Sequence, residues 1–136
     1  MQGRAFLDIA QELANGATEG HWRTAVGRAY YALMLEGRDF LQRWGFVPPP
    51  RQNVHAYVRL QLLYAGDRDL KRVGDTLDRL ARWRNQADYV LTSGGPFGTD
   101  RWATQAVAFS SDAITLRDQI DADPARRAAA IASLPP

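Results

Sequence analysis

The sequence predicts an all-α protein, an antiparallel helical bundle of about five helices followed by a short C-terminal helix or a flexible tail. Apolar residues recur at alternating spacings of three and four in every well-patterned segment, and strand-like alternation never persists for more than a few residues. With 136 residues, of which 46% are hydrophobic and 24% charged, the chain fits one domain that buries its own core. We expect the bundle over residues 1–121 and the helix or tail over residues 122–136.

Helix-ending residues set the limits of the first two helices. The first ends at Asn15-Gly16, two residue types that tolerate a left-handed cap. Thr18 is expected to cap a second and much longer helix. This helix stops at Gly45, because three consecutive prolines (48–50) cannot continue it.

Two glycines, Gly27 and Gly37, fall inside the long second helix. Each glycine destabilises a helix interior by about 1 kcal/mol relative to alanine, so its presence there needs a reason. We expect another backbone to pack closely against the helix at both positions.

Three longer helical segments and one short one follow. The third helix covers residues 53–64 and is apolar on two sides, which predicts burial on more than one face. The fourth carries an apolar stripe that leads to Arg84, and the fifth begins at Thr99. Asp123-Pro124 combines a capping residue with a proline at the first helical position, so a short helix can follow, with a frayed tail as the alternative. The inward face predicted for the fifth helix contains Trp102, Ala106, Phe109, Ala113, Leu116 and Ile120.

A glycine-rich stretch at residues 90–98 connects the fourth and fifth helices. Phosphate-binding loops of glycine follow a strand and supply a Lys-Ser/Thr pair, and this stretch has neither. We expect a plain flexible connector.

The composition excludes several kinds of site. The chain has no cysteine, which rules out disulfides, thiolate nucleophiles, iron–sulfur clusters and cysteine-ligated zinc. His21 and His55 are the only histidines, and we expect no metal and no cofactor. The 17 Lys and Arg residues exceed the 15 Asp and Glu residues by only +2, which is too little to predict nucleic-acid binding by itself.

Membrane association is not expected either. The longest unbroken apolar run, Ala29–Leu35, is far below the roughly 20 residues that a membrane span needs. Gln11 and Glu12 lie where a signal peptide requires an apolar stretch. We therefore expect a cytoplasmic protein.

Arg84 breaks the apolar pattern of the fourth helix. It occupies a position where the stripe that begins at Leu70 predicts another leucine, and a charge on an inward face is costly unless it is paired or solvated. Asp88 follows at the spacing of a helical ion pair, and Asn85 and Tyr89 add an amide and a phenol. The stripe therefore leads to a helix-ending salt bridge, to a polar cleft or to a subunit interface.

Residues 28–32 are Arg-Ala-Tyr-Tyr-Ala, residues 84–89 are Arg-Asn-Gln-Ala-Asp-Tyr, and His55 opens the helix between these segments. Together they resemble the signature of the HEPN family (higher eukaryotes and prokaryotes nucleotide-binding domains). The order of elements matches from about residue 4 to residue 121. The resemblance implies a helical bundle, commonly a homodimer, in which the Arg-Asn segments of two subunits face each other across a cleft.

The resemblance also implies an activity and a partner. Catalytic HEPN proteins are metal-independent endoribonucleases whose motif is an arginine, usually a polar residue, and then a histidine a few positions later. Many are toxins encoded beside a minimal nucleotidyltransferase antitoxin, and others act in phage defence. Arg84 and Asn85 match the first part of this motif, but Tyr89 stands where the histidine is expected.

The tyrosine changes the chemistry that the motif can perform. Metal-free RNA cleavage needs a base for the ribose 2′-hydroxyl and an acid for the leaving oxygen, with pKa values near the working pH. A tyrosine, with a pKa of about 10, is a poor base at neutral pH. The candidate catalytic residues are Arg84, Asn85, Asp88 and Tyr89. The candidate ligand-binding residues are Arg84, Tyr31, Arg28 and His55.

Three functions follow from these observations. The first is a HEPN-like, homodimeric protein that binds RNA or a nucleotide in a toxin–antitoxin or phage-defence system and has reduced or absent nuclease activity. The second is an active metal-independent endoribonuclease toxin neutralised by a nucleotidyltransferase antitoxin. The third is a non-catalytic helical scaffold.

Overall fold

The computed structural model describes residues 1–92 and 95–136, and over these ranges the chain is helical with no β-strand. None of the helices described there is both long and apolar enough to cross a bilayer. The prediction of an all-α bundle is confirmed. The elements are α1 (Ala5–Ala14), α2 (Glu19–Arg43), α3 (Val54–Leu63), α4 (Arg68–Tyr89), the 3-10 turn η1 (Gly95–Phe97), α5 (Arg101–Ala122) and α6 (Pro124–Ala132).

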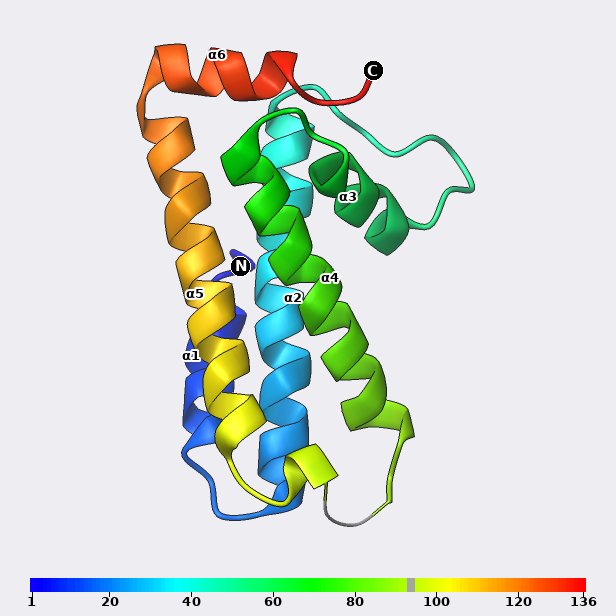
Figure 1. Cartoon of the computed structure of the whole chain (residues 1–136), viewed down its shortest axis with the longest axis vertical. Helices are drawn as coiled ribbons and strands as arrows, with labels where there is room; N and C mark the ends of the chain where they lie inside the picture. Colours follow the sequence, from blue (N-terminus) through cyan, green and yellow to red (C-terminus); the bar gives the residue numbers. More distant parts are fainter. Residues whose placement is uncertain (93–94) are drawn as a thin grey trace.

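The long helix α2 lies at the centre of the bundle (Figure 1). It packs against α1, α4 and α5, while α3 lies against α4 and α6 crosses one end next to α5. Many of its residues are fully or nearly fully buried, among them Val26, Ala29, Leu33, Phe40 and Leu41. Because α2 touches most of the other helices, its side chains are the ones that bring distant parts of the sequence together.

Local capping chemistry explains where the helices begin. The Thr18 hydroxyl accepts from the His21 backbone N–H at 3.2 Å, and the Asp123 carboxylate caps α6, so both predicted caps are confirmed. The fifth helix begins two residues later than predicted, at Arg101. The Thr99 hydroxyl accepts from the Arg101 backbone N–H at 3.3 Å, which still supplies a partner to the first turn.

The connector at residues 90–98 is only partly described, because residues 93 and 94 lie outside the described ranges. Its second part forms η1, in which Phe97 is buried against the bundle. The ring of Phe97 lies 5.5 Å from that of Trp102 in an edge-to-face arrangement. This half of the connector is therefore packed and anchored, unlike the plain connector that was expected.

The buried face of α5 is rotated relative to the predicted one. Phe109 and Leu116 are only half-buried, whereas Ser110 is fully buried and donates from Oγ to the Ala29 carbonyl oxygen at 2.9 Å. Small residues in the centre of this face let α5 approach α2 closely. The buried residues of α5 are Ala103, Ala106, Val107, Ser110, Ala113, Ile114, Arg117 and Ile120.

Two tryptophans fill the flank between α4 and α5. The rings of Trp83 and Trp102 stack with centroids 4.3 Å apart and planes 12° from parallel. Phe109 adds a tilted ring 5.8 Å from Trp83. These half-buried rings form an aromatic contact between α4 and α5.

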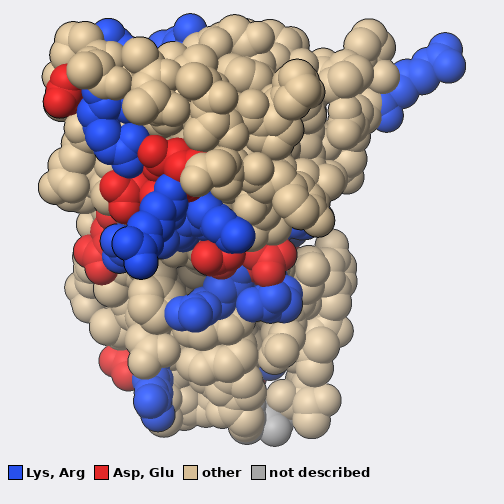
Figure 2. All heavy atoms as spheres, turned by 45° about the horizontal axis from the view of Figure 1, so that its top comes forward, with Lys and Arg blue, Asp and Glu red and all other residues tan. Residues whose placement is uncertain are grey.

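Charged side chains tie α6 to the start of α4. Arg126 donates to Asp67 at 2.6 Å and to Asp69 at 2.9 Å. The hydrogen bond from Arg126 lowers the pKa of Asp67, so this carboxylate stays charged throughout the neutral range. Figure 2 shows blue and red side chains beside one another over the face that its view brings forward, not a field of one sign. The segment after residue 123 is therefore a docked helix.

The glycines of α2 do not behave as predicted. An added Cβ at Gly37 would meet the side chain of Val58 at 3.0 Å, and at Gly27 it would meet nothing within 4 Å. The expected backbone contact is thus wrong at both positions. A close backbone approach occurs instead at Gly74, where a Cβ would lie 2.7 Å from the carbonyl carbon of Leu62, because α3 and α4 touch there.

These surroundings predict opposite effects of alanine at two buried glycines. Gly27→Ala should raise the free energy of unfolding by about 1 kcal/mol, because it restores helix propensity and its methyl group has room. Gly74→Ala should lower it, because the methyl group would collide with the backbone of α3. Urea unfolding followed by far-UV circular dichroism measures both. A Gly27→Ala protein less stable than the wild type would contradict the open space assigned to this position.

Candidate functional site

The end of α4 is fixed to the start of α2 by Arg23. One guanidinium nitrogen, Nη1, donates to the carbonyl oxygens of Ala87 at 2.9 Å and Val90 at 2.8 Å. The other side of the guanidinium pairs with Glu19 at 2.9 Å. The last carbonyls of a helix have no partner inside the helix, and a cation also complements the dipole there. Arg23 therefore fixes the last turns of α4, which carry Arg84.

Arg84 points from α4 toward α2, with a side chain that is 23% exposed. Its Nε donates to the Asp88 carboxylate at 3.1 Å, so the predicted helix-ending ion pair is present. Its guanidinium carbon also lies 5.6 Å from the ring centroid of Tyr30 and 5.3 Å from that of Tyr31. A guanidinium at this distance is attracted by the negative charge on the faces of aromatic rings. The inward-facing cation is thus held by a carboxylate and two tyrosines.

The two tyrosines meet His55 at the first turn of α3. Tyr30 is nearly fully buried, and its hydroxyl lies 2.6 Å from Nδ1 of His55. The rings of Tyr30 and His55 are almost parallel, with centroids 5.8 Å apart. The half-buried ring of Tyr31 stands edge-on to both, at 5.4 Å and 5.9 Å. As expected for neighbours on a helix, one tyrosine is in the core and the other is nearer the surface.

A second arginine, Arg28, also lies against the ring of Tyr31. Its guanidinium carbon is 5.0 Å from the Tyr31 ring centroid and 5.4 Å from that of Phe6 on α1. Its Nε is buried and has no hydrogen-bond partner within the described ranges. The four predicted ligand-binding residues therefore lie together around the ring of Tyr31, and Tyr30 is a fifth member of the group because it contacts Tyr31, His55 and Arg84. We call Arg28, Tyr30, Tyr31, His55 and Arg84 the cation–aromatic cluster.

The surroundings of the cluster set its protonation. Burial, together with the positive charges of Arg84 and Arg59, lowers the pKa of His55. Burial raises the pKa of Tyr30. At neutral pH both groups are therefore uncharged. The donor of the hydrogen bond between them is Oη of Tyr30 or Nδ1 of His55, depending on the imidazole tautomer. The second ring nitrogen of His55 takes no part in this bond.

The remaining catalytic candidates are less closely assembled. Asn85 is exposed and projects about 100° around the helix from Arg84. Tyr89, the last residue of α4, is 73% exposed. Within the described ranges Asp88 is the one member of this trio that hydrogen-bonds Arg84. A single copy of the chain therefore does not gather the Arg-Asn-Tyr segment into one enclosed site.

Two residues of the site were not among the sequence candidates. Tyr30 joins His55 to Arg84, and Arg59 of α3 acts on the charge of His55. The adjacent tyrosines were the available signal, because the core member of such a pair needs a partner for its hydroxyl. His21 takes no part in the site as described, since its Nδ1 lies 2.7 Å from the Thr18 hydroxyl at the start of α2.

Comparison of the chain with models of protein families, with curated proteins and with solved structures found no match. Across residues 1–92 and 95–136, no group of three or more His, Cys, Asp or Glu side chains is placed to hold a metal ion. The chemistry that the cluster offers is aromatic stacking, guanidinium charge and a neutral imidazole.

The cluster predicts that the charge of Arg84 contributes to the lowered pKa of His55, in addition to burial. Arg84→Gln should raise the pKa of His55, because it removes a nearby positive charge that opposes protonation of the imidazole. The pKa is measured by NMR, from the pH dependence of the imidazole ring protons. Arg72→Gln is the matched control, since Arg72 is an exposed arginine on the same helix and, within the described ranges, is not among the charges that act on His55. Equal His55 titration in all three proteins would contradict the assigned proximity.

Proposed function

We propose that the chain is a HEPN-like domain that binds RNA or a nucleotide through the cation–aromatic cluster. The observation that supports this most directly is the guanidinium of Arg84 lying on the rings of Tyr30 and Tyr31. Aromatic faces stack on nucleobases of any sequence, and arginine matches the oxygens of a phosphate. Tyr31 and Arg84 are each partly exposed, so both kinds of contact are offered at one place on the surface.

The meeting of distant segments supports the family part of the proposal. Residues 28–32, residues 84–89 and His55 carry the HEPN resemblance, and they come from α2, α4 and α3. In the folded chain they share ring and guanidinium contacts. A chance resemblance in three separate segments gives no reason for such contacts. We extend the proposal to the context of the family, a toxin–antitoxin or phage-defence system with a minimal nucleotidyltransferase as partner.

The end of α4 supports a homodimer. Tyr89, Val90 and Leu91 are 73%, 53% and 72% exposed, and they form a short apolar run directly after the Arg-Asn segment. Neighbouring exposed apolar residues of this kind are typical of surfaces that another protein covers. A second copy placed there would bring two Arg84 segments toward each other, as the HEPN resemblance implies.

A specific observation favours the endoribonuclease as a second candidate. His55 lies close enough to Arg84 for the arginine's charge to lower the pKa of the imidazole. The imidazole is therefore uncharged at neutral pH, the form in which it can accept a proton. It would take the role of base that Tyr89 cannot fill, while Arg84 would stabilise the negative charge that develops on the phosphate oxygens in the transition state. The same lowered pKa leaves little protonated imidazolium at neutral pH, so this candidate lacks an evident proton donor for the leaving group.

RNA binding is tested by fluorescence anisotropy with a labelled single-stranded oligonucleotide. Tyr31→Ala should weaken binding by roughly 5- to 150-fold, which corresponds to one lost stacking contact. Arg84→Gln should weaken it too and should reduce its dependence on salt, because one phosphate contact is lost. Tyr64→Ala, which removes a tyrosine that is 73% exposed, is the matched control. Equal losses in Tyr31→Ala and Tyr64→Ala would contradict a site at the cluster.

A cleavage assay with chelator present separates binding from catalysis. The wild-type protein should leave RNA intact even at high protein concentration. Cleavage that is abolished by both His55→Ala and Arg84→Ala would instead establish the endoribonuclease. The scaffold would be the better description if the wild type binds neither RNA nor nucleotide and Arg84→Leu keeps or raises stability.

A further inference from the structure

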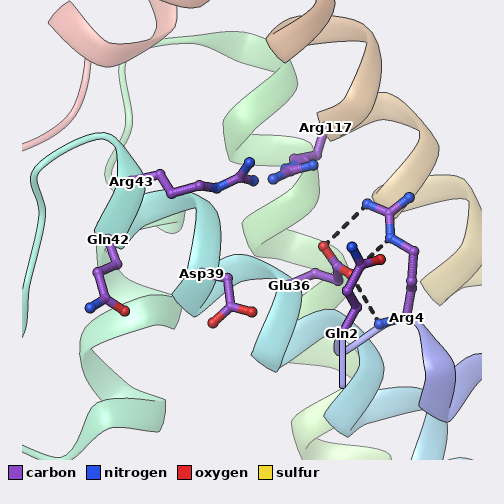
Figure 3. Close-up of a pocket in the computed structure, with 7 residues that line it drawn as sticks. All are labelled: Gln2, Arg4, Glu36, Asp39, Gln42, Arg43 and Arg117. Atoms are coloured by element: carbon purple, nitrogen blue, oxygen red, sulfur yellow. Dashed lines mark hydrogen bonds and ion pairs between the residues drawn. The ribbon is translucent and has the colours of Figure 1, made fainter.

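A hollow of about 710 Å³ lies on another side of α2, between the N-terminal segment and α5. It shares no residue with the cation–aromatic cluster. Figure 3 shows its side chains, which come from the start of the chain, the second half of α2 and the second half of α5. It is lined by Gln2, Arg4, Glu36, Asp39, Gln42, Arg43 and Arg117.

In one part of this hollow, Arg4 is fully paired with two carboxylates. Arg4 donates to Glu36 through Nε at 2.9 Å and to Asp118 through Nη1 and Nη2 at 3.0 Å. These two carboxylates engage all three nitrogens of the Arg4 guanidinium, and the nearly buried Glu36 also accepts from the Arg4 backbone N–H at 3.0 Å. Asp39 on the rim is engaged by Arg38 at 3.1 Å. Arg4 and the acids of the hollow therefore already have partners.

Arg117 is incompletely paired. The residue is 5% exposed and packs its guanidinium carbon 5.1 Å from the ring centroid of Phe40. Its Nη1 donates to Asp118 at 2.7 Å, but Asp118 is shared with Arg4. Its Nε and Nη2 are buried and have no hydrogen-bond partner in the described part of the chain. A buried donor without a partner is unfavourable, and more so on a charged group.

The two unpaired nitrogens form one edge of the guanidinium. An Nε–Nη2 edge presents two parallel N–H groups, the arrangement that binds two oxygens of a phosphate or carboxylate. No carboxylate of this hollow is left for that edge. The unpaired edge of Arg117 therefore fits an oxyanion from outside the chain.

A second cation lies at the mouth of the hollow. Arg43, the last residue of α2, is exposed and forms no ion pair within the described ranges. Figure 3 shows its guanidinium pointing toward that of Arg117. Two cations that face each other repel, and an oxyanion between them would turn the repulsion into attraction for both. Nε and Nη2 of Arg117 are buried, so neighbouring side chains have to shift before an anion can reach them, and Arg43, exposed at a helix end, is free to change rotamer as it contacts the anion.

We propose that this hollow binds a phosphate group, held by the Nε–Nη2 edge of Arg117 and by Arg43. Inorganic phosphate and the terminal phosphate of a small phosphomonoester offer the same oxygens, so either can fill it. Phosphate is favoured over a monovalent carboxylate because two guanidinium groups face one position and a phosphate carries more charge.

The test compares the melting temperature of the full chain in chloride, inorganic phosphate and adenosine monophosphate at constant ionic strength. Saturable stabilisation by phosphate, as mass action predicts for a ligand of the native state, is the expected result. Stabilisation by the monophosphate alone would identify a phosphomonoester as the ligand. Equal melting temperatures in all three solutions would overturn the proposal.

Two variants place the effect in the hollow. Arg117→Met keeps a long side chain on Phe40 and should lose the stabilisation by phosphate. Arg43→Gln should raise the dissociation constant for phosphate by about tenfold or more. Arg72→Gln is the control, because Arg72 is an exposed arginine on α4. If Arg117→Met does not fold, Arg43→Gln decides, read by the line width of the phosphate ³¹P NMR signal. An undiminished response in Arg43→Gln would overturn the site.

Discussion

The cation–aromatic cluster depends on how α4 is held against α2, and Arg23 is the side chain that holds it. A helix end leaves carbonyl oxygens without partners, and Arg23 supplies donors to Ala87 and Val90 from the neighbouring helix. The same guanidinium lies 4.5 Å from the ring centroid of Phe97, so the connector after α4 is anchored at the same point. With that end fixed, Arg84, about one turn before Ala87, lies over the tyrosines of α2.

Arginines on inward positions link the two sites. Arg84 and Arg117 both lie on helix faces that are otherwise apolar, where an unpaired charge is costly. Arg84 meets this cost with Asp88 and two aromatic rings and remains partly exposed. Arg117 is more deeply buried and pairs through only one of its nitrogens. Arg84 is therefore part of a surface that a binding partner can contact, whereas Arg117 is a buried cation with two nitrogens that lack a hydrogen-bond acceptor among the described residues.

Much of this structure was accessible from the sequence because local chemistry decides it. Thr18 and Asp123 cap their own helices, and the apolar stripe of α4 made Arg84 conspicuous. The meeting of Tyr30 with His55 was not accessible, because it depends on how α3 is placed after a long loop. Arg117 was missed because the large apolar residues of α5 predicted one buried face, whereas the buried face in the structure is rotated from it and includes Ser110 and Arg117. The positions of glycines in the sequence likewise do not reveal which one lies against a neighbouring backbone, and in the structure it is Gly74.

The stacked indoles of Trp83 and Trp102 give the contact between α4 and α5 an intrinsic optical reporter. Two aromatic chromophores held face to face couple their electronic transitions, and the coupling falls steeply as they separate. The other two tryptophans of the chain, Trp22 and Trp44, lie on α2 or at its end, and neither makes a ring contact with this stack in the described part of the chain. Sliding or parting of α4 from α5 is therefore visible in unlabelled protein by near-UV dichroism, even where helix content stays constant.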